Sequence, residues 1–382
     1  MSSSSYIHDF KIVLPRHRIN QDFLTTWIAK CHQHADSMKP TAERMEPELL
    51  AKLFARYAVK ATQISERHFD CNDVEISDYS RNEIFRIDPE HPAGVDIEAR
   101  TRFFEKRADE VFHEFYDVTK SIDRPDHLIH VTCTGYVSPS AAQKIVTHEN
   151  WNHPTAITHA YHMGCYASLP AVRLATALSK SVARVDIAHN EMCGLHMNPT
   201  LQTPEQFVVQ TLFADGHVKY SVSETKKVKG RSLRVKAILE RVVPDSKDDM
   251  TWLPTAMGLQ MTLSREIPAK VKQVLPRFAR DLFDQAEMSF ESARKSVFAI
   301  HPGGPKIIDS VQEALELDVN QIRESRKILF ERGNMSSATL PHVWNEIIDG
   351  TSNDGVYDPG THVVSFAFGP GLTLFGAVFE IC

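Results

Sequence analysis

Three side chains in this sequence have the types needed to hold an acyl group on sulfur and to stabilise an enolate. Cys165 precedes a predicted helix, His301 begins the run His-Pro-Gly-Gly, and Asn334 begins Asn-Met-Ser-Ser after a glycine. A cysteine thiolate is a nucleophile that forms thioesters. An imidazole N–H and a carboxamide N–H can stabilise the oxyanion that forms when a malonyl thioester loses carbon dioxide. If the fold brings the three together, they indicate carbon–carbon bond formation by decarboxylative condensation.

The sequence around Cys165 predicts an activated thiol. Ser168 is a suitable N-cap, and Pro170 suits the first turn of a helix from about residue 169 to 179. The positive end of that helix, and His301 if it lies nearby, would lower the pKa of the thiol. Taken singly, the three residues have ordinary interpretations as a buried cysteine, a core histidine and an asparagine that ends a helix.

The elements that must position these residues are predicted to alternate between strands and helices. Buried strands are expected at residues 128–134, 182–188, 297–300, 363–368 and 374–381. Helices are expected within residues 20–70, over 98–122, over 265–283 with breaks near Pro268 and Pro276, and over 320–330. A further strand pair is expected around Asp215-Gly216, from Val208-Val209 to residues 218–222. This alternation predicts an α/β fold of layered sheets and helices.

The bulk composition is typical of a globular protein. The chain has 382 residues, 42% of them hydrophobic and 24% charged, with a formal net charge of −6. We expect no nucleic-acid partner because phosphate binding needs a basic face. We also expect no membrane span, because no stretch approaches the roughly 20 apolar residues required. Six scattered cysteines and a polar N-terminus without a secretory signal predict free thiols and a cytoplasmic location.

One local exception to the acidic balance is the basic stretch from Lys226 to Lys236. Its charges could hold the phosphates of coenzyme A or face an acidic carrier protein. The alternative interpretation is a solvated hairpin.

The chain resembles type III polyketide synthases, the chalcone synthase-like branch of the thiolase superfamily of condensing enzymes. Four stretches carry the resemblance, namely His162-Met163-Gly164-Cys165, Ile300-His301-Pro302-Gly303-Gly304-Pro305, Gly333-Asn334-Met335-Ser336-Ser337-Ala338 and Phe368-Gly369-Pro370-Gly371-Leu372-Thr373. The resemblance implies a thiolase-like fold of two similar α/β halves in an α-β-α-β-α arrangement. Residues 1–235 would form the half that carries the cysteine, and residues 236–382 the half that carries the histidine and the asparagine.

The resemblance also implies roles for single residues. Cys165 would be the acyl nucleophile, and His301 and Asn334 would promote decarboxylation and stabilise the oxyanion. Phe213 matches a gatekeeper phenylalanine between the entrance tunnel and the active site. Other residues expected at the substrate cavity are Ser336, Gly369, Pro370 and Gly371. Members of this family form homodimers and use coenzyme A thioesters as substrates, so neither a permanently bound cofactor nor a metal is expected.

The sequence departs from chalcone synthases at positions that shape the cavity. Met261 stands where a second gatekeeper phenylalanine is usual, and His196 replaces a small polar residue. Bulkier or more polar groups there would shorten or redirect the product. The basic residues that hold coenzyme A in the family correspond to the neighbourhood of Lys60 and Arg67.

The predicted function is condensation of an acyl thioester starter with malonyl units, followed by cyclisation to a pyrone, resorcinol or phloroglucinol type of product. The acyl donors are expected to be acyl-coenzyme A and malonyl-coenzyme A, with an acyl carrier protein as an alternative donor. One alternative function joins two β-ketoacyl thioesters into an α-pyrone. Relatives of that kind use a glutamate from the partner subunit, and here only Glu149 lies near the matching loop, residues 136–140. Another alternative is acyl transfer without condensation.

Two other classes remain open from the sequence. His159, His162 and Cys165 would share one face of a helix and could bind a metal, although Pro154 and Gly164 argue against a regular helix there. The chain could also be an inactive subunit that shapes the product of another synthase, although the presence of all three reactive residues argues against that.

Overall fold

The computed structural model describes residues 4–117, 123–151, 154–224, 230–350 and 356–382. Within these residues a nine-stranded sheet has the order β11-β12-β13-β8-β1-β7-β6-β4-β5. In chain order its strands are β1 (Tyr6–Val13), β4 (His127–Thr132), β5 (Ala156–Tyr161), β6 (Val185–Met192), β7 (Asp215–Ser223), β8 (Leu233–Val242), β11 (Val297–Ile300), β12 (His362–Gly369) and β13 (Thr373–Ile381).

Two groups of strands make up this sheet. In the first, β4 pairs parallel with β5 and β6, β6 pairs antiparallel with β7, and β7 pairs antiparallel with β1. In the second, β11 and β12 are parallel, and β13 pairs antiparallel with β12 and β8. A short antiparallel contact joins the groups, where Tyr6 and Ile7 of β1 face Arg234 and Leu233 of β8. The expected boundary between residues 235 and 236 lies within β8, and the division into two halves stays a prediction.

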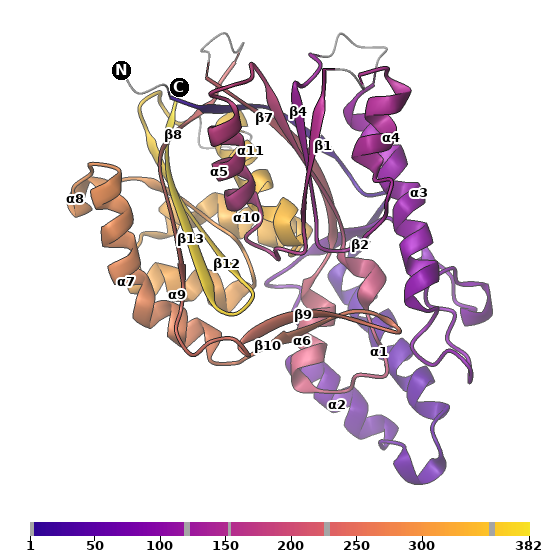
Figure 1. Cartoon of the computed structure of the whole chain (residues 1–382). Coiled ribbons are helices and arrows are strands. Elements are labelled where there is room, and N and C mark those ends of the chain that lie inside the picture. The colour runs from indigo at the N-terminus through magenta and orange to yellow at the C-terminus, as the bar shows by residue number, and fades with distance from the viewer. Residues whose placement is uncertain (1–3, 118–122, 152–153, 225–229, 351–355) are drawn as a thin grey trace.

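Helices cover both faces of this sheet and also fill the space between the two groups of strands. On one flank lie α3 (Ile97–Phe115) and α4 (Ala141–His148), and on the other lie α7 (Ile267–Gln285) and α9 (Pro305–Leu315) (Figure 1). Between them, α5 (Ser168–Leu178) and α11 (Thr339–Asp349) pack against strands of both groups. Successive strand residues pack into different layers because their side chains point to opposite faces of the sheet. Leu128 packs with the α3 and α4 side chains, whereas Ile129 packs with α5 and α11. The predicted layered α/β fold is therefore confirmed.

The remaining elements lie around this layered core. The helices are α1 (Gln21–Ser37), α2 (Pro47–Tyr57), α6 (Pro204–Leu212), α8 (Phe290–Ala293) and α10 (Arg323–Arg332). Short 3-10 helices are η1 (Thr41–Glu43), η2 (Asp73–Glu75), η3 (Tyr79–Arg81), η4 (Cys193–His196), η5 (Val319–Ile322) and η6 (Ser336–Ala338). Two small antiparallel pairs are β2 (His17–Asn20) with β3 (Glu66–Phe69), and β9 (Met250–Thr255) with β10 (Gly258–Leu263). None of the helices in the described part of the chain has the length and apolar character needed to cross a bilayer.

Two predictions about secondary structure were wrong. Val208-Val209 was expected in a strand but lies in α6, where Thr203 accepts a hydrogen bond from the backbone N–H of Gln206 and Pro204 occupies the first turn. The helix expected to break near Pro276 runs unbroken as α7, because one side of it is buried against the sheet. Residues 233–236 of the basic stretch lie in β8, whereas residues 226–229 lie outside the described residues, so the expected hairpin stays a prediction. The sequence analysis also missed α9, α11 and the β9–β10 pair.

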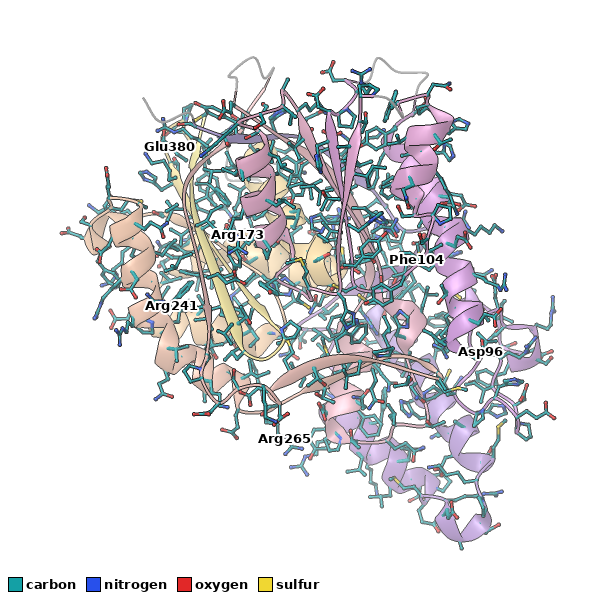
Figure 2. All side chains as sticks on the ribbon, in the orientation of Figure 1. Asp96, Phe104, Arg173, Arg241, Arg265 and Glu380 are labelled. Carbon is teal, nitrogen blue, oxygen red and sulfur yellow. The ribbon has the colours of Figure 1, made fainter. Side chains whose placement is uncertain are left out.

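One close approach fixes the loop that follows β4. A Cβ atom on Gly135 would lie 2.2 Å from the ring of Phe104, which projects from α3 toward this loop (Figure 2). Any larger residue would push α3 away from the sheet. Glycine is therefore required here for space.

Buried neutral histidines make the folded state sensitive to acid. Burial lowers the pKa of eleven histidines in the described part of the chain, and the largest shifts are to about 4 for His8 and His32 and to about 3 for His130, His189, His196, His301 and His342. Their ordinary pKa is 6.5, so their contribution to stability is complete above that pH and is lost as pH falls toward 3. Each can cost up to about 1.4 kcal/mol per pH unit below 6.5. Two buried carboxyls with raised pKa, Glu191 and Asp215, oppose this trend but are fewer.

We therefore expect a lower urea midpoint at pH 5 than at pH 7.5. The His130→Gln variant, which keeps a polar side chain but removes one titrating ring, should lose less stability between the two pH values than the unmodified protein. A midpoint that stays constant or rises on acidification would contradict this expectation.

Candidate active site

Cys165, His301 and Asn334 meet at one cavity, although they come from distant parts of the chain. Cys165 lies between β5 and α5, His301 directly follows β11, and Asn334 follows Gly333 at the end of α10. The cavity has a volume of about 370 Å³. Its other lining residues are Phe213, Met250, Met261, Leu263, Gly303, Ile307 and Phe368. The structure therefore brings together all three residues that the sequence pointed to as reactive.

A backbone contact places Phe213 beside Asn334. The N–H of Asn334 donates to the carbonyl of Leu212 at 3.0 Å, and the N–H of Ala214 donates to the carbonyl of Asn334 at 2.8 Å. These two bonds form a short parallel bridge. Gly333 allows the close approach with its φ of +70°, because a Cβ there would lie 2.9 Å from the carbonyl oxygen of Leu212.

The orientation of the Asn334 carboxamide is set by its oxygen. Oδ1 accepts a hydrogen bond from the N–H of Ser336 at 2.9 Å and another from the hydroxyl of Thr339 at 3.3 Å. The amide nitrogen is thereby left to donate toward the sulfur of Cys165, which also interacts with the Ser336 side chain. Ser336 has a φ of +51°, a left-handed conformation that a non-glycine residue rarely adopts.

The pKa of the Cys165 thiol differs from the sequence prediction. Burial raises it to about 12, while the hydrogen bonds from Ser336 and Asn334 act in the opposite direction. The predicted lowering was wrong because desolvation of the thiolate outweighs these donors. The N-cap prediction was also wrong, since Ala167 holds that position and Ser168 is the first helical residue. Pro170 lies in the first turn, as expected.

His301 presents an uncharged ring to the cavity. Its backbone N–H donates to the carbonyl of Phe366 at 2.7 Å, which anchors the residue at the end of β11. Neither ring nitrogen has a hydrogen-bond partner among the described residues. Burial lowers the pKa of the ring to about 3, so it stays neutral at physiological pH. A neutral imidazole can donate an N–H to a substrate oxygen without giving up the proton.

Two further thiols and a carboxyl lie near Cys165, and the sequence analysis did not identify them. Cys133 and Cys193 line a smaller adjoining cavity of about 310 Å³ together with Cys165, Ser336 and Pro370. The sulfur of Cys133 accepts a hydrogen bond from the N–H of Gly164 at 3.0 Å. Only their position in buried strand-like sequence could have pointed to them, and that signal does not separate a cavity residue from a core residue.

The carboxyl is Glu191, which is fully buried on β6. It accepts hydrogen bonds from the N–H of Cys133 at 3.0 Å, from the Thr134 hydroxyl at 2.9 Å and from the Ser337 hydroxyl. Burial raises its pKa despite these donors. Any charge on this group also raises the pKa of Cys165.

A larger cavity of about 860 Å³ lies beyond Phe213 and Met261, which also line the smaller one. His196 lines this larger cavity, but both of its ring nitrogens are engaged, with the carbonyl of Thr134 at 2.8 Å and the N–H of Leu259 at 3.1 Å. The other lining side chains are mainly apolar and include Leu24, Trp27, Ile28, Phe85, Val209 and Leu201.

The Gly369–Gly371 loop packs on the turn that carries Cys165. A Cβ on Gly164 would lie 2.4 Å from the Pro370 ring, and a Cβ on Gly369 would lie 2.1 Å from the Tyr166 ring. Pro370 lines the cavity of about 310 Å³, whereas Gly369 and Gly371 line none of the cavities described here.

The two residues proposed to hold coenzyme A are placed differently. Arg67 is only 1% exposed and donates to the Gln21 side chain and to the carbonyls of Gln210 and Phe213. It therefore supports the gatekeeper segment from inside the protein, and its prediction as a phosphate ligand was wrong. Lys60 is exposed beyond the end of α2, so its role stays a prediction.

Neither alternative site predicted from sequence lies at these cavities. His159 bonds to the Ser140 hydroxyl from strand β5, and His162 bonds to the carbonyl of Trp252, so they do not form a ligand cluster with Cys165. Glu149 is the C-cap of α4 and is hydrogen-bonded to His148, and it lines none of the cavities described here.

Comparisons with known proteins agree with this architecture. Residues 234–381 match the family described as "Chalcone and stilbene synthases, C-terminal domain". The probable polyketide synthase 1 of Dictyostelium discoideum is 28% identical over 260 residues, which are 66% of this chain and 8% of that protein. The chain thus spans only a small part of the length of this curated relative.

Three solved structures share the fold. The C-terminal type III polyketide synthase domain of Steely1, a type I/III hybrid from Dictyostelium, superposes with a TM-score of 0.81 at 24% identity, covering 99% of both chains. PKS-I from the brown alga Ectocarpus siliculosus gives 0.82 at 18% identity, covering 100% of this chain and 99% of that one. The 1,3,6,8-tetrahydroxynaphthalene synthase of Streptomyces coelicolor A3(2) gives 0.77 at 20% identity, covering 98% and 99%. The predicted thiolase-like fold is confirmed.

The donors around Cys165 lead to a test of thiol reactivity. Because the pKa is about 12, alkylation of Cys165 by iodoacetamide should still accelerate above pH 9, the ordinary pKa of a cysteine. Ser336→Ala should slow the reaction by roughly tenfold for each pKa unit by which the loss of a donor raises the pKa further. Peptide mass spectrometry measures the rate at this residue alone. A rate that reaches a plateau below pH 9, or an unchanged rate in the variant, would contradict the assignment of these donors.

Proposed function

We propose that the chain extends an acyl thioester starter with malonyl units and cyclises the product. The premise is that the chain belongs to the type III polyketide synthases, the chalcone and stilbene synthase family of thiolase-like condensing enzymes. The observation that carries the proposal is the convergence of a thiol, an imidazole and a carboxamide on one cavity of about 370 Å³. Each of the three has a chemical capacity that the reaction requires.

In the first step, the sulfur of Cys165 attacks the carbonyl carbon of the acyl thioester. The new carbon–sulfur bond forms, the bond to the coenzyme A sulfur breaks, and the proton of the Cys165 thiol ends on the departing sulfur. The Asn334 amide and the Ser336 side chain stabilise the thiolate during attack, since both interactions favour the ionised sulfur. The buried carboxyl of Glu191 works against ionisation when it is charged, so its raised pKa favours the reaction.

In the second step, a malonyl thioester binds with its carbonyl oxygen between the His301 ring and the Asn334 amide. The bond to the carboxylate carbon breaks, carbon dioxide leaves, and the electron pair becomes an enolate. His301 and Asn334 donate N–H groups to the enolate oxygen, and the neutral state of His301 keeps it from protonating the carbanion. The carbanion then attacks the thioester on Cys165, and the sulfur leaves as the extended chain returns to coenzyme A.

Coenzyme A would enter past the side of the cavity formed by Leu263 and Ile307. Basic residues cluster near that side. Arg265 follows β10 (Figure 2) and lies over the Tyr57 ring, and Arg56 lies over the same ring. We propose that these two guanidinium groups, together with Lys60, attract the coenzyme A phosphates or an acidic carrier protein.

Three further features of the proposal concern the starter, the assembly and the location. The apolar cavity of about 860 Å³ is suited to a hydrocarbon chain on the starter. Strand β5 lies at the end of the sheet order and has one edge unpaired among the described residues, which supports a homodimer formed by pairing of two copies at β5. All six cysteines lie in the described part of the chain without a disulfide, which supports a cytoplasmic location.

Variants at the three reactive residues test the chemistry. Cys165→Ala should abolish both self-acylation by a radiolabelled acyl-coenzyme A and product formation. His301→Ala should still acylate Cys165 but lose about 10²- to 10³-fold in release of carbon dioxide from malonyl-coenzyme A, because it removes one oxyanion donor. Cys382→Ser is the matched control and should behave like the unmodified protein. Labelling of the Cys165→Ala variant, or full condensation by it, would refute the assignment.

The larger cavity can be tested separately by reducing its volume. Leu201→Trp should lower kcat/KM for long-chain acyl starters by about tenfold or more, with little effect on acetyl-coenzyme A, because only the long chains need the space. Leu49→Trp, at an exposed leucine on α2, is the control. Equal losses for long and short starters would show that the acyl chain does not occupy this cavity.

A further inference from the structure

Two histidines and a glutamate converge on the surface, away from the cavities described above. His113 projects from the last turn of α3, His148 is the last residue of α4, and Glu149 follows it as the C-cap. One potential ligand atom from each of the three lies within 4.8 Å of the other two. The two imidazole rings stand nearly perpendicular at 83°, with centroids 4.7 Å apart. Such spacing is compatible with three donors around a single ion.

The hydrogen bonding pairs two members of this cluster and leaves the third outside that pair. Nδ1 of His148 lies 2.7 Å from a carboxylate oxygen of Glu149. His113 has no such hydrogen bond among the described residues, although its ring faces that of His148. Both histidines are exposed, whereas the Glu149 side chain is 11% exposed. A partly buried carboxylate beside two accessible imidazoles favours a cation that contacts all three.

The backbone adds negative potential at the same place. Lys144 of α4 bonds to both Glu105 and Asp109 of α3, and His148, further along α4, faces His113, further along α3, so the two helices run side by side in the same direction. Their C-terminal ends therefore lie together at His113 and His148. The C-terminus of a helix carries the negative end of its dipole, so the two dipoles favour a positive ion here. The ammonium group of Lys144 is bonded to its two carboxylates, so it does not occupy the end of the helix pair where the histidines lie.

We propose that His113, His148 and Glu149 form a binding site for a divalent transition-metal ion, with Zn²⁺ the best match. Two imidazole nitrogens and one carboxylate oxygen are a ligand set suited to Zn²⁺, and water would complete the coordination. Mg²⁺ and Ca²⁺ prefer all-oxygen ligands and should bind poorly. The ion would replace the hydrogen bond between His148 and Glu149 and tie the end of α3 to the end of α4.

The consequence for the protein is structural. Helix α4 starts after Ser140, whose hydroxyl caps it, and the preceding loop contains Tyr136, which bonds to His162 next to the Cys165 turn. An ion that binds only the folded helix pair stabilises the folded state according to its affinity and concentration. The site takes no part in the proposed condensation, so it stands or falls independently of the proposed function.

Isothermal titration calorimetry with Zn²⁺ tests this proposal directly, and visible absorption of Co²⁺ reports the donor set. The unmodified protein should bind one equivalent of Zn²⁺, and its thermal midpoint should rise with Zn²⁺ but not with Mg²⁺. His113→Ala, His148→Ala and Glu149→Gln should each weaken binding by tenfold or more and abolish the rise in midpoint. His91→Ala, which removes a histidine outside the cluster whose ring bonds to Asp88, should leave both readouts unchanged.

Both histidines are at exposed positions and Glu149 is partly buried, and far-ultraviolet circular dichroism checks that each of the three variants folds. Zn²⁺ binding that survives in both histidine variants, or an unmodified protein that binds no Zn²⁺ at micromolar concentrations, would overturn the proposal. A Co²⁺ complex whose spectrum does not change in Glu149→Gln would remove the carboxylate from the ligand set and would also overturn it as stated.

Discussion

The backbone bridge between Phe213 and Asn334 is the contact on which the site depends. It joins the segment between α6 and β7 to the end of α10, so it couples the two groups of strands at the reacting centre. It also positions two side chains at once. Phe213 is placed in the wall shared by the two larger cavities, and Asn334 is placed with its amide nitrogen toward Cys165. Arg67 reinforces the bridge from below by donating to the carbonyl of Phe213 at 2.6 Å.

Burial decides the electrostatics of this centre. Removal from water raises the pKa of Cys165 and of Glu191 and lowers that of His301. All three shifts favour neutral groups, as expected where few full charges are close enough to compensate desolvation. A neutral site suits a reaction in which negative charge appears only transiently on sulfur and on oxygen. The donors need not be charged if they are already pointed at the atoms where that charge develops.

The order of the elements followed largely from local sequence patterns, and the errors have local causes. Strands at β4, β6, β11, β12 and β13 were predicted because buried strands are continuous β-branched or apolar runs. Val208-Val209 has the same composition, yet the N-cap at Thr203 and Pro204 set it in a helix. Pro276 should have ended α7, but the apolar side of that helix is held against the sheet, which compensates for one missing hydrogen bond. In both cases context overrode composition.

The sequence by itself determined which chemistry was available. It supplied one thiol, one imidazole and one carboxamide in turn-like segments, with the glycines that those segments need. Only the tertiary structure decided that the three share a cavity, because their convergence depends on pairings between segments far apart in the chain. It also decided that the pKa of the Cys165 thiol is raised, whereas the sequence analysis had predicted that it is lowered. A helix terminus can be recognised from neighbouring residues, whereas the degree of burial depends on everything that packs around the sulfur.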